Sequence, residues 1–161
     1  MSKGMIQIYY GEGRGKTAAA IGKAFLKASE GMSVTLIQFL KGKKESELAF
    51  FKRMEPEMKV FRFAKQDAWF DDLSEEEQQE ELMNLKNGFN YCKKVVATGA
   101  SDMIILDEVL GLLDREVITF EELKEVLEAK PDHMTIICTG IVLDERLRDI
   151  ADEIINIAID I

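Results

Sequence analysis

The chain has 161 residues, a length typical of one domain, and its composition excludes several classes of protein. A net charge of −9 argues against a nucleic-acid partner, because binding nucleic acid needs a positively charged surface. The sequence contains no apolar stretch of signal-peptide or membrane-span length, so we expect no membrane association. Cys92 and Cys138 are far apart and lack partners at metal-binding spacing, which predicts reduced, buried thiols in a cytoplasmic protein.

Strand and helix signals alternate along the first part of the chain. An apolar run leads into a glycine-rich turn, and Gly31 is placed to end the helix that follows. In chain order, the pattern predicts a strand over 5–10, a helix from 16 to about 31, a strand over 34–39, a short helix over 46–54 and a strand over 58–63.

Two capping boxes organise the second part of the chain. Ser74 and Thr119 each stand three residues before a glutamate, so the hydroxyl and the glutamate can satisfy free N–H groups at the start of a helix. The pattern predicts helices from Ser74 to Gly99 and from Thr119 to just before Pro131, strands over 103–107, 135–139 and 153–159, and a short helix from 144 to about 150.

The turn after the first strand has the composition of a polyphosphate-binding loop. Its glycines allow successive backbone N–H groups to face one concavity, and the helix N-terminus adds partial positive charge. Lys16 supplies a full charge to the outer phosphates, and Thr17 offers a hydroxyl to Mg²⁺. The alternative is a glycine-rich turn without a ligand. The residues predicted to bind the nucleotide are Gly11, Glu12, Gly13, Arg14, Gly15, Lys16, Thr17 and Ala18.

The order of elements predicts an α/β fold of the P-loop NTPase type. Repeated alternation of strands and helices is typical of an open, mostly parallel sheet with helices on both faces. We therefore expect residues 1–161 to form a single P-loop nucleotide-binding domain with a sheet of about six strands. Ligands of such sheets bind at the carboxyl ends of the strands, where the glycine-rich turn lies.

A second chemical feature is the pair Asp107-Glu108, which follows four apolar residues and so lies at the carboxyl end of a central strand. An acid there can hold Mg²⁺ opposite the Thr17 hydroxyl, and the second acid could instead activate water. The alternative is a carboxylate that caps the next helix. Thr139-Gly140, at the end of the next strand, could line the nucleotide or form a turn.

Two further groups are candidate substrate contacts. Gln38 and Lys41 stand at the end of the second strand, beside two more lysines, and could meet phosphate or an acidic substrate. A solvated surface loop is the alternative for these lysines. Trp69 and Phe70 lie in a polar stretch, where they could wall off a planar ligand or fold into the core.

The sequence resembles the P-loop family of ATP:corrinoid adenosyltransferases, which act on cob(I)alamin or cob(I)yrinic acid a,c-diamide. The order and spacing match across nearly the whole chain, and a loop that lacks the usual first glycine, here replaced by Tyr10, is itself characteristic of the family. The segments that carry the resemblance are Gly4 to Gly22, Gln38-Phe39-x-Lys41-Gly42, Ile104-Ile105-Leu106-Asp107-Glu108, Thr139-Gly140 and Ile150-Ala151-Asp152.

The resemblance implies an alkyl transfer. Such enzymes bind ATP with Mg²⁺ (or Mn²⁺), the Co(I) of a corrinoid attacks the ribose C5′, and the intact triphosphate leaves. It implies catalytic roles for Lys16 and Glu108, with Thr17, Asp107 and Glu108 at the metal. It also implies a homodimer and an electron donor, either a flavoprotein or reduced flavin, that produces Co(I).

The chain departs from the family pattern at several places. Thr139-Gly140 is followed by Ile141 where the family has Arg, and the segments at both ends of many family members are missing. The aromatic motif of the corrinoid side is represented only by Ala68-Trp69-Phe70. Two other functions therefore stay open: an ATPase or other ATP-dependent enzyme on a different small substrate, and a non-catalytic nucleotide- or corrinoid-binding relative.

Overall fold

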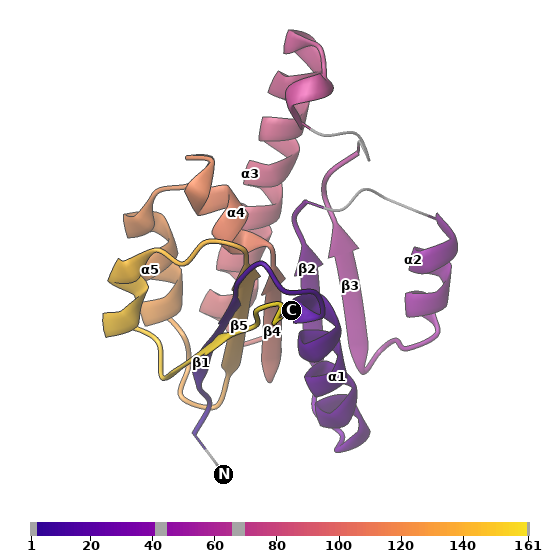
Figure 1. The fold of residues 1–161 in the computed structure, drawn as a ribbon. Helices are drawn as coiled ribbons and strands as arrows, with labels where there is room; N and C mark the ends of the chain where they lie inside the picture. Colours follow the sequence, from indigo (N-terminus) through magenta and orange to yellow (C-terminus); the bar gives the residue numbers. More distant parts are fainter. Residues whose placement is uncertain (1–2, 41–44, 66–69, 161) are drawn as a thin grey trace.

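The computed structural model describes residues 3–40, 45–65 and 70–160, and its centre is a six-stranded parallel sheet (Figure 1). The strand order is β3-β2-β4-β5-β1-β6. Each neighbouring pair of strands is parallel, which confirms the predicted α/β fold class. The strands are β1 (Ile6–Tyr10), β2 (Val34–Gln38), β3 (Met58–Arg62), β4 (Met103–Asp107), β5 (Thr135–Gly140) and β6 (Glu153–Asn156).

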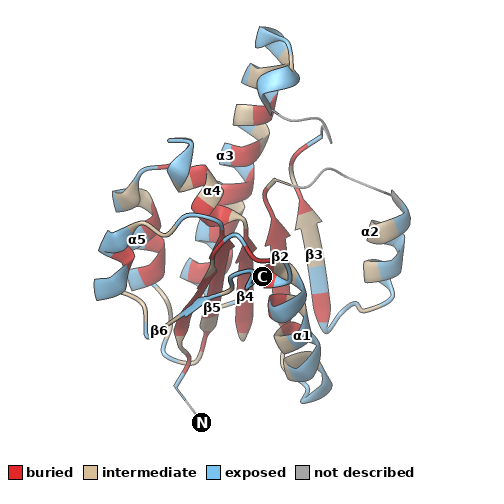
Figure 2. Cartoon of the chain, viewed as in Figure 1, coloured by how far each residue is buried: buried red, intermediate tan, exposed pale blue. Residues whose placement is uncertain are grey.

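Helices cover both faces of the sheet. The α-helices are α1 (Lys16–Ser29), α2 (Glu45–Lys52), α3 (Glu75–Thr98), α4 (Val109–Asp114) and α5 (Phe120–Glu128), with short 3-10 turns at Phe70–Asp72 and Glu145–Asp149. Apolar residues of α1 and α2 pack with one face of the strands, and those of α3, α4 and α5 pack with the other. Figure 2 shows the result, with buried strands between partly exposed helices.

The middle strands are apolar throughout because both of their faces are covered. Every residue of β2 and of β4 is buried. Cys92 and Cys138 are free and buried, as predicted, and burial raises the pKa of both thiols, so both stay protonated and unreactive at neutral pH.

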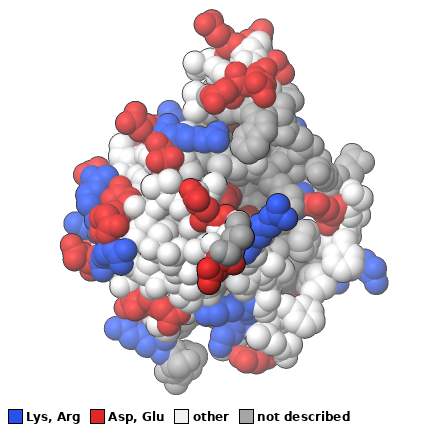
Figure 3. Space-filling model, in the orientation of Figure 1, with Lys and Arg blue, Asp and Glu red and all other residues white. Residues whose placement is uncertain are grey.

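The predicted capping boxes are confirmed at both helices. Ser74 Oγ accepts from Glu77 N and Thr119 Oγ1 accepts from Glu122 N, each at the start of its helix. Gly99 ends α3 in the left-handed conformation, which favours glycine. Acidic side chains gather at the start of α3 and on the turn before it (Figure 3), where they complement the helix dipole.

Most element bounds lie close to their predicted positions, for example α2 ends at Lys52 rather than 54, and two elements differ further. The last strand ends at Asn156 rather than 159, because its partner β1 ends at Tyr10 and the chain then turns away into the loop. The helix α4 was not predicted, since six mostly apolar residues show no clear helical period. No helix in the described residues is long and apolar enough to cross a membrane.

Candidate functional site

The carboxyl ends of the parallel strands bring the predicted chemical groups to one edge of the sheet. The glycine-rich loop follows β1, Asp107 ends β4, and Gln38 ends β2 in register with Asp107. The loop and the acidic pair are therefore neighbours although about 90 residues separate Thr17 from Asp107 in sequence.

Glycine is required in the first half of the loop by close packing against the C-terminal segment. A Cβ atom at Gly11 would lie 2.3 Å from Ile157 O, and one at Gly13 would lie 2.5 Å from the same atom. Gly13 N donates to Ile157 O at 2.8 Å, and Gly11 N donates to Ile141 O at 3.1 Å. The N–H groups of these two glycines therefore bond to the chain itself, and the N–H groups later in the loop stay the predicted contacts of the phosphates.

The second half of the loop keeps the features of an anion site. Gly15 has a φ of 98°, a left-handed conformation that lets the chain enter α1 without a side-chain cap. The N–H groups of the first turn of α1 have no acceptor within the helix. Lys16 is buried, and its Nζ donates to Gly13 O at 2.8 Å, so its charge is held beside these N–H groups.

The Asp107 carboxylate is buried among neutral donors. Thr17 Oγ1 donates to Asp107 Oδ1 at 2.9 Å, and Thr139 Oγ1 donates to the same oxygen at 2.8 Å. Gln38 Nε2 donates to the second oxygen, Oδ2, at 3.2 Å. A buried carboxylate is costly without a positive partner, and all three of these donors are uncharged. The arrangement therefore favours a cation at this position.

Glu108 takes a strained backbone conformation beside Asp107. Its φ is 65°, and it stands at the residue that precedes α4. Burial raises the pKa of the Glu108 carboxyl, and the charge of Asp107 raises it further, while Lys16 and Arg115 oppose the shift. A shifted carboxyl at a ligand-binding edge is typical of functional sites. Its backbone N–H donates to Thr139 Oγ1 at 2.8 Å, which ties the acidic pair to β5.

The oxygen atoms at this edge fit a hard divalent cation. The Thr17 hydroxyl and the Asp107 carboxylate are in contact, and Glu108 follows in sequence. The described residues hold no cluster of three or more His, Cys, Asp or Glu side chains that could hold a metal by themselves. Mg²⁺ prefers one or two carboxylates together with substrate phosphates and waters, so this donor set fits Mg²⁺ bound with a nucleotide.

A cavity of about 390 Å³ opens beside Thr17, at the end of the loop. Thr17, Gln38 and Arg62 contribute polar groups to it, and Phe50 and Phe51 of α2 form an aromatic wall. Phe50 is 59% exposed, so its ring is accessible to a ligand in the cavity. The volume lies in the range of small-molecule sites, so part of a ligand can enter beside Thr17.

The remaining predicted residues either lie outside the described part of the chain or are exposed on the surface. Lys41 and Trp69 lie outside the described residues, and Phe70 begins a short 3-10 turn whose first side chain is not described. In the loop, Glu12, Arg14 and Ala18 are exposed at the surface. Ile141, at the position where the resemblance leads us to expect Arg, is 53% exposed.

Arg62 is a site residue that the sequence did not reveal. Its side chain is 1% exposed, and its Nε donates to Gln38 Oε1 at 2.7 Å. The sequence holds one signal for it: in β3, where inward and outward positions alternate, Arg62 is a charged residue at an inward position. That signal does not say which residues the arginine meets, because its partners come from other strands.

Comparison with known proteins gives one consistent result. A profile of the ATP:corrinoid adenosyltransferases BtuR/CobO/CobP matches residues 2–159. The corrinoid adenosyltransferase CobA of Salmonella typhimurium is 28% identical over 94% of this chain and 75% of its own length. The corrinoid adenosyltransferase of Escherichia coli K12 is 26% identical, with the same coverage of both chains.

Among solved structures, a KaiC-like protein from Pyrococcus horikoshii OT3 matches with a TM-score of 0.59 at 19% identity. The match covers 98% of this chain and 73% of that one, and it supports the fold alone. The profile match spans the glycine-rich loop, the acidic pair and the strands that bring them together. The chain therefore belongs to the family of ATP:corrinoid adenosyltransferases BtuR/CobO/CobP.

Proposed function

We propose that this protein transfers the 5′-deoxyadenosyl group of ATP to the Co(I) centre of a corrinoid and releases triphosphate. Family membership supports the substrate pair. The observation that carries the proposal is the contact between Thr17 Oγ1 and Asp107 Oδ1 at the N-terminus of α1. This contact connects the proposed polyphosphate site with a buried carboxylate, whose charge a bound cation would stabilise.

The reaction balances as a substitution at carbon. The electron pair of Co(I) forms a bond to C5′ of the ribose, the C5′–O bond breaks, and its electrons leave with the triphosphate. Negative charge therefore gathers on the leaving group. Lys16, held by its bond to Gly13 O, and the first-turn N–H groups of α1 would lie beside that charge and would stabilise the transition state more than the bound substrate.

Thr17 and Asp107 would hold the Mg²⁺ that accompanies ATP, with Glu108 as a further carboxylate beside it. The cation supplies neutralisation of the phosphate charge when it is bound. Asp107 is kept in place by three hydrogen bonds, and Glu108 is held by the backbone bond to Thr139. Because the substitution at C5′ takes no proton from either substrate, we assign both carboxylates to the metal rather than to a general base.

The cavity beside Thr17 would receive the nucleoside end of ATP and the edge of the corrinoid. Its aromatic wall, Phe50 and Phe51, matches planar, largely apolar groups. With the triphosphate bound on the loop and the nucleoside in this cavity, the C5′ atom would lie where the loop meets the cavity. Gln38, Lys41, Trp69 and Phe70 remain proposed substrate contacts in or near this region.

We further propose the cellular setting that the chemistry demands. A Co(I) corrinoid must be produced by an electron donor, for which a flavoprotein or reduced flavin is suitable. Two free, protonated thiols fit a reducing cytoplasmic compartment. A homodimer is the expected assembly, and the oligomeric state can be measured by sedimentation in the presence and absence of MgATP.

The test is anaerobic incubation of the protein with MgATP and chemically reduced cob(I)alamin or cob(I)inamide. Formation of the cobalt–carbon bond is followed by absorbance, and triphosphate is measured in the same samples. We expect equal amounts of adenosylated corrinoid and triphosphate. Phosphate release without corrinoid would instead identify an ATPase. ATP binding without either product would identify a non-catalytic relative.

A further inference from the structure

Three polar residues stand side by side at the carboxyl ends of β3, β2 and β4. Arg62 is in register with Gln38, and Gln38 is in register with Asp107. Their exposed fractions are 4%, 1% and 4%, respectively. Residues in register on parallel strands project from the same face of the sheet, so the three side chains form one buried row beneath α1 and α2.

Arg62 determines which way the Gln38 amide faces. An arginine side chain has only donors, so the Gln38 Oε1 atom must face the Arg62 Nε atom, as the 2.7 Å bond shows. The NH₂ group is then directed at Asp107, where Nε2 donates to Oδ2 at 3.2 Å. With Oδ2 held in this way, Oδ1 is the oxygen that faces Thr17.

Stability alone does not explain a buried arginine in this place. Desolvating a guanidinium costs free energy that an apolar side chain of similar size would avoid. Glu47 of α2 anchors the other end of the group, with Arg62 Nη2 2.6 Å from Glu47 Oε2. The guanidinium is thus fixed at both ends, which gives Gln38 a rigid partner.

We infer that Arg62 is a positioning residue for the metal end of the site: through Gln38, it holds the Asp107 carboxylate in the orientation that binds the Mg²⁺ of MgATP. The inference rests on the proposed function, because it takes MgATP as the ligand of the loop. Partners that orient a metal ligand usually change metal affinity by roughly 10- to 100-fold when they are removed.

The experiment measures ATP binding by calorimetry, with Mg²⁺ and with EDTA, and needs no corrinoid. The variants are Arg62→Met and Gln38→Met, and the control is Lys59→Met, which removes an exposed positive charge from the same strand. We expect both test variants to lose about tenfold of the Mg²⁺-dependent gain in ATP affinity. Their affinity in EDTA should fall by clearly less than their affinity in Mg²⁺, because both side chains also line the cavity beside Thr17. Both affinities of the control Lys59→Met should equal those of the wild type.

A double-mutant cycle tests whether the effect passes through Asp107. In the Asp107→Asn background, Arg62→Met should cause no further loss of the Mg²⁺-dependent gain, because its target is already altered. Additive losses, equal losses in Mg²⁺ and EDTA, or no loss in either test variant would overturn the inference. If Arg62→Met does not fold, Gln38→Met interrupts the same row at its second member and decides the outcome.

Failure of the proposed function gives a different result. A wild-type protein that forms no adenosylated corrinoid, while its Mg²⁺-dependent gain still depends on Arg62, would refute the transfer reaction and leave the role of Arg62 standing. A wild-type protein that binds ATP equally with Mg²⁺ and EDTA would refute the metal site and the role of Arg62 together.

Discussion

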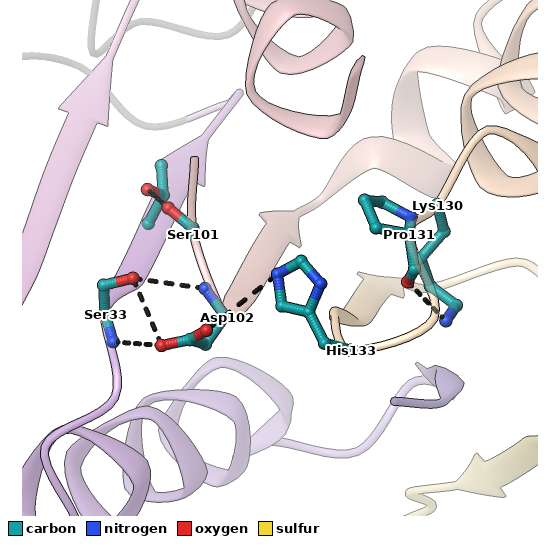
Figure 4. A network of polar contacts seen from close by, with 7 residues as sticks. Ser33, Ser101, Asp102, Lys130, Pro131 and His133 are labelled. Atoms are coloured by element: carbon teal, nitrogen blue, oxygen red, sulfur yellow. Dashed lines mark hydrogen bonds and ion pairs between the residues drawn. The ribbon is translucent and has the colours of Figure 1, made fainter. Parts of the chain in front are cut away.

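The two ends of β4 each carry an aspartate, and the two sites differ in almost every physical respect. Asp102, just before the strand, has a side chain 41% exposed, and its Oδ2 accepts from the backbone N of Ser33 at 2.9 Å. His133 Nε2 lies 3.9 Å from the other oxygen (Figure 4). Asp107, at the last position of the strand, is buried, whereas Asp102 is only half-buried. The three side chains that donate to the Asp107 carboxylate are neutral.

The difference separates a structural carboxylate from one prepared for a ligand. Asp102 joins the starts of β2 and β4 through its hydrogen bonds with Ser33. Its carboxylate is partly exposed, so water solvates the rest of its charge. Asp107 has little access to water, and the three side chains that donate to it are neutral, so a bound cation would stabilise its charge. Sequence alone makes the two aspartates look alike, since both flank one apolar run.

The largest effect is expected at Lys16, and Lys130, near the opposite edge of the sheet, serves as its control. Lys16→Ala removes the charge beside the first-turn N–H groups and should weaken ATP binding by about 100-fold, since hydrogen bonds to charged groups contribute roughly 1.5–3 kcal/mol each. Lys130→Ala removes a lysine that also donates to backbone oxygens, that of Gly4 and that of Pro131, the second of which Figure 4 shows, and should leave ATP affinity unchanged. Calorimetry measures both, and equal losses would refute the phosphate role of Lys16.

The aspartates give the next comparison. Asp107→Asn directs an NH₂ group at either the hydroxyls or the Gln38 NH₂, so we expect turnover to fall by at least about 100-fold and unfolding free energy by roughly 1–3 kcal/mol. Asp102→Asn can still accept from Ser33, and stability should change by less than about 1 kcal/mol with full activity. Urea titration measures the unfolding free energy of the two variants, and the absorbance assay measures their turnover. A similar loss of turnover in both would contradict a special role for Asp107.

Replacing Glu108 should raise the stability of the protein and lower its activity. Its raised pKa means that the folded state holds the proton more tightly than the unfolded chain does, so the wild type loses stability as pH rises from the usual range of a glutamate through the raised pKa. Glu108→Gln carries no such penalty and should melt at a higher temperature than the wild type at neutral pH, while losing turnover. The gap should close below pH 4, and thermal melts across pH measure it. A gap that does not depend on pH would contradict this account.

The smallest effect is expected at Ile141. Its side chain is 53% exposed, so replacing it with Arg costs little stability. An exposed cation near phosphate contributes up to about 1 kcal/mol, and Ile141→Arg should tighten ATP binding by roughly two- to fivefold at low salt. The gain should shrink as salt is added, because salt screens exposed charges. Val142→Arg, at an equally exposed neighbour, serves as the control.

Local signals in the sequence predicted the parts of the fold that depend on near neighbours. The capping boxes at Ser74 and Thr119 were predictable because each joins a hydroxyl to an N–H three residues away. The strand–loop–helix around Lys16 and the place of Asp107 at a strand end follow from apolar runs and glycines in the same way.

The tertiary structure alone decided how these parts meet. The bond between Arg62 and Gln38 spans 24 residues, because β3 pairs with β2. The bond between Gln38 and Asp107 spans 69 residues, because β4 also pairs with β2 rather than with its predecessor β3. The packing of Ile157 on Gly13 likewise brings the end of the chain to its beginning. A sequence specifies which residues can sit at the end of a strand, but strand order and register determine which of those residues touch, and both are set by packing of the whole sheet.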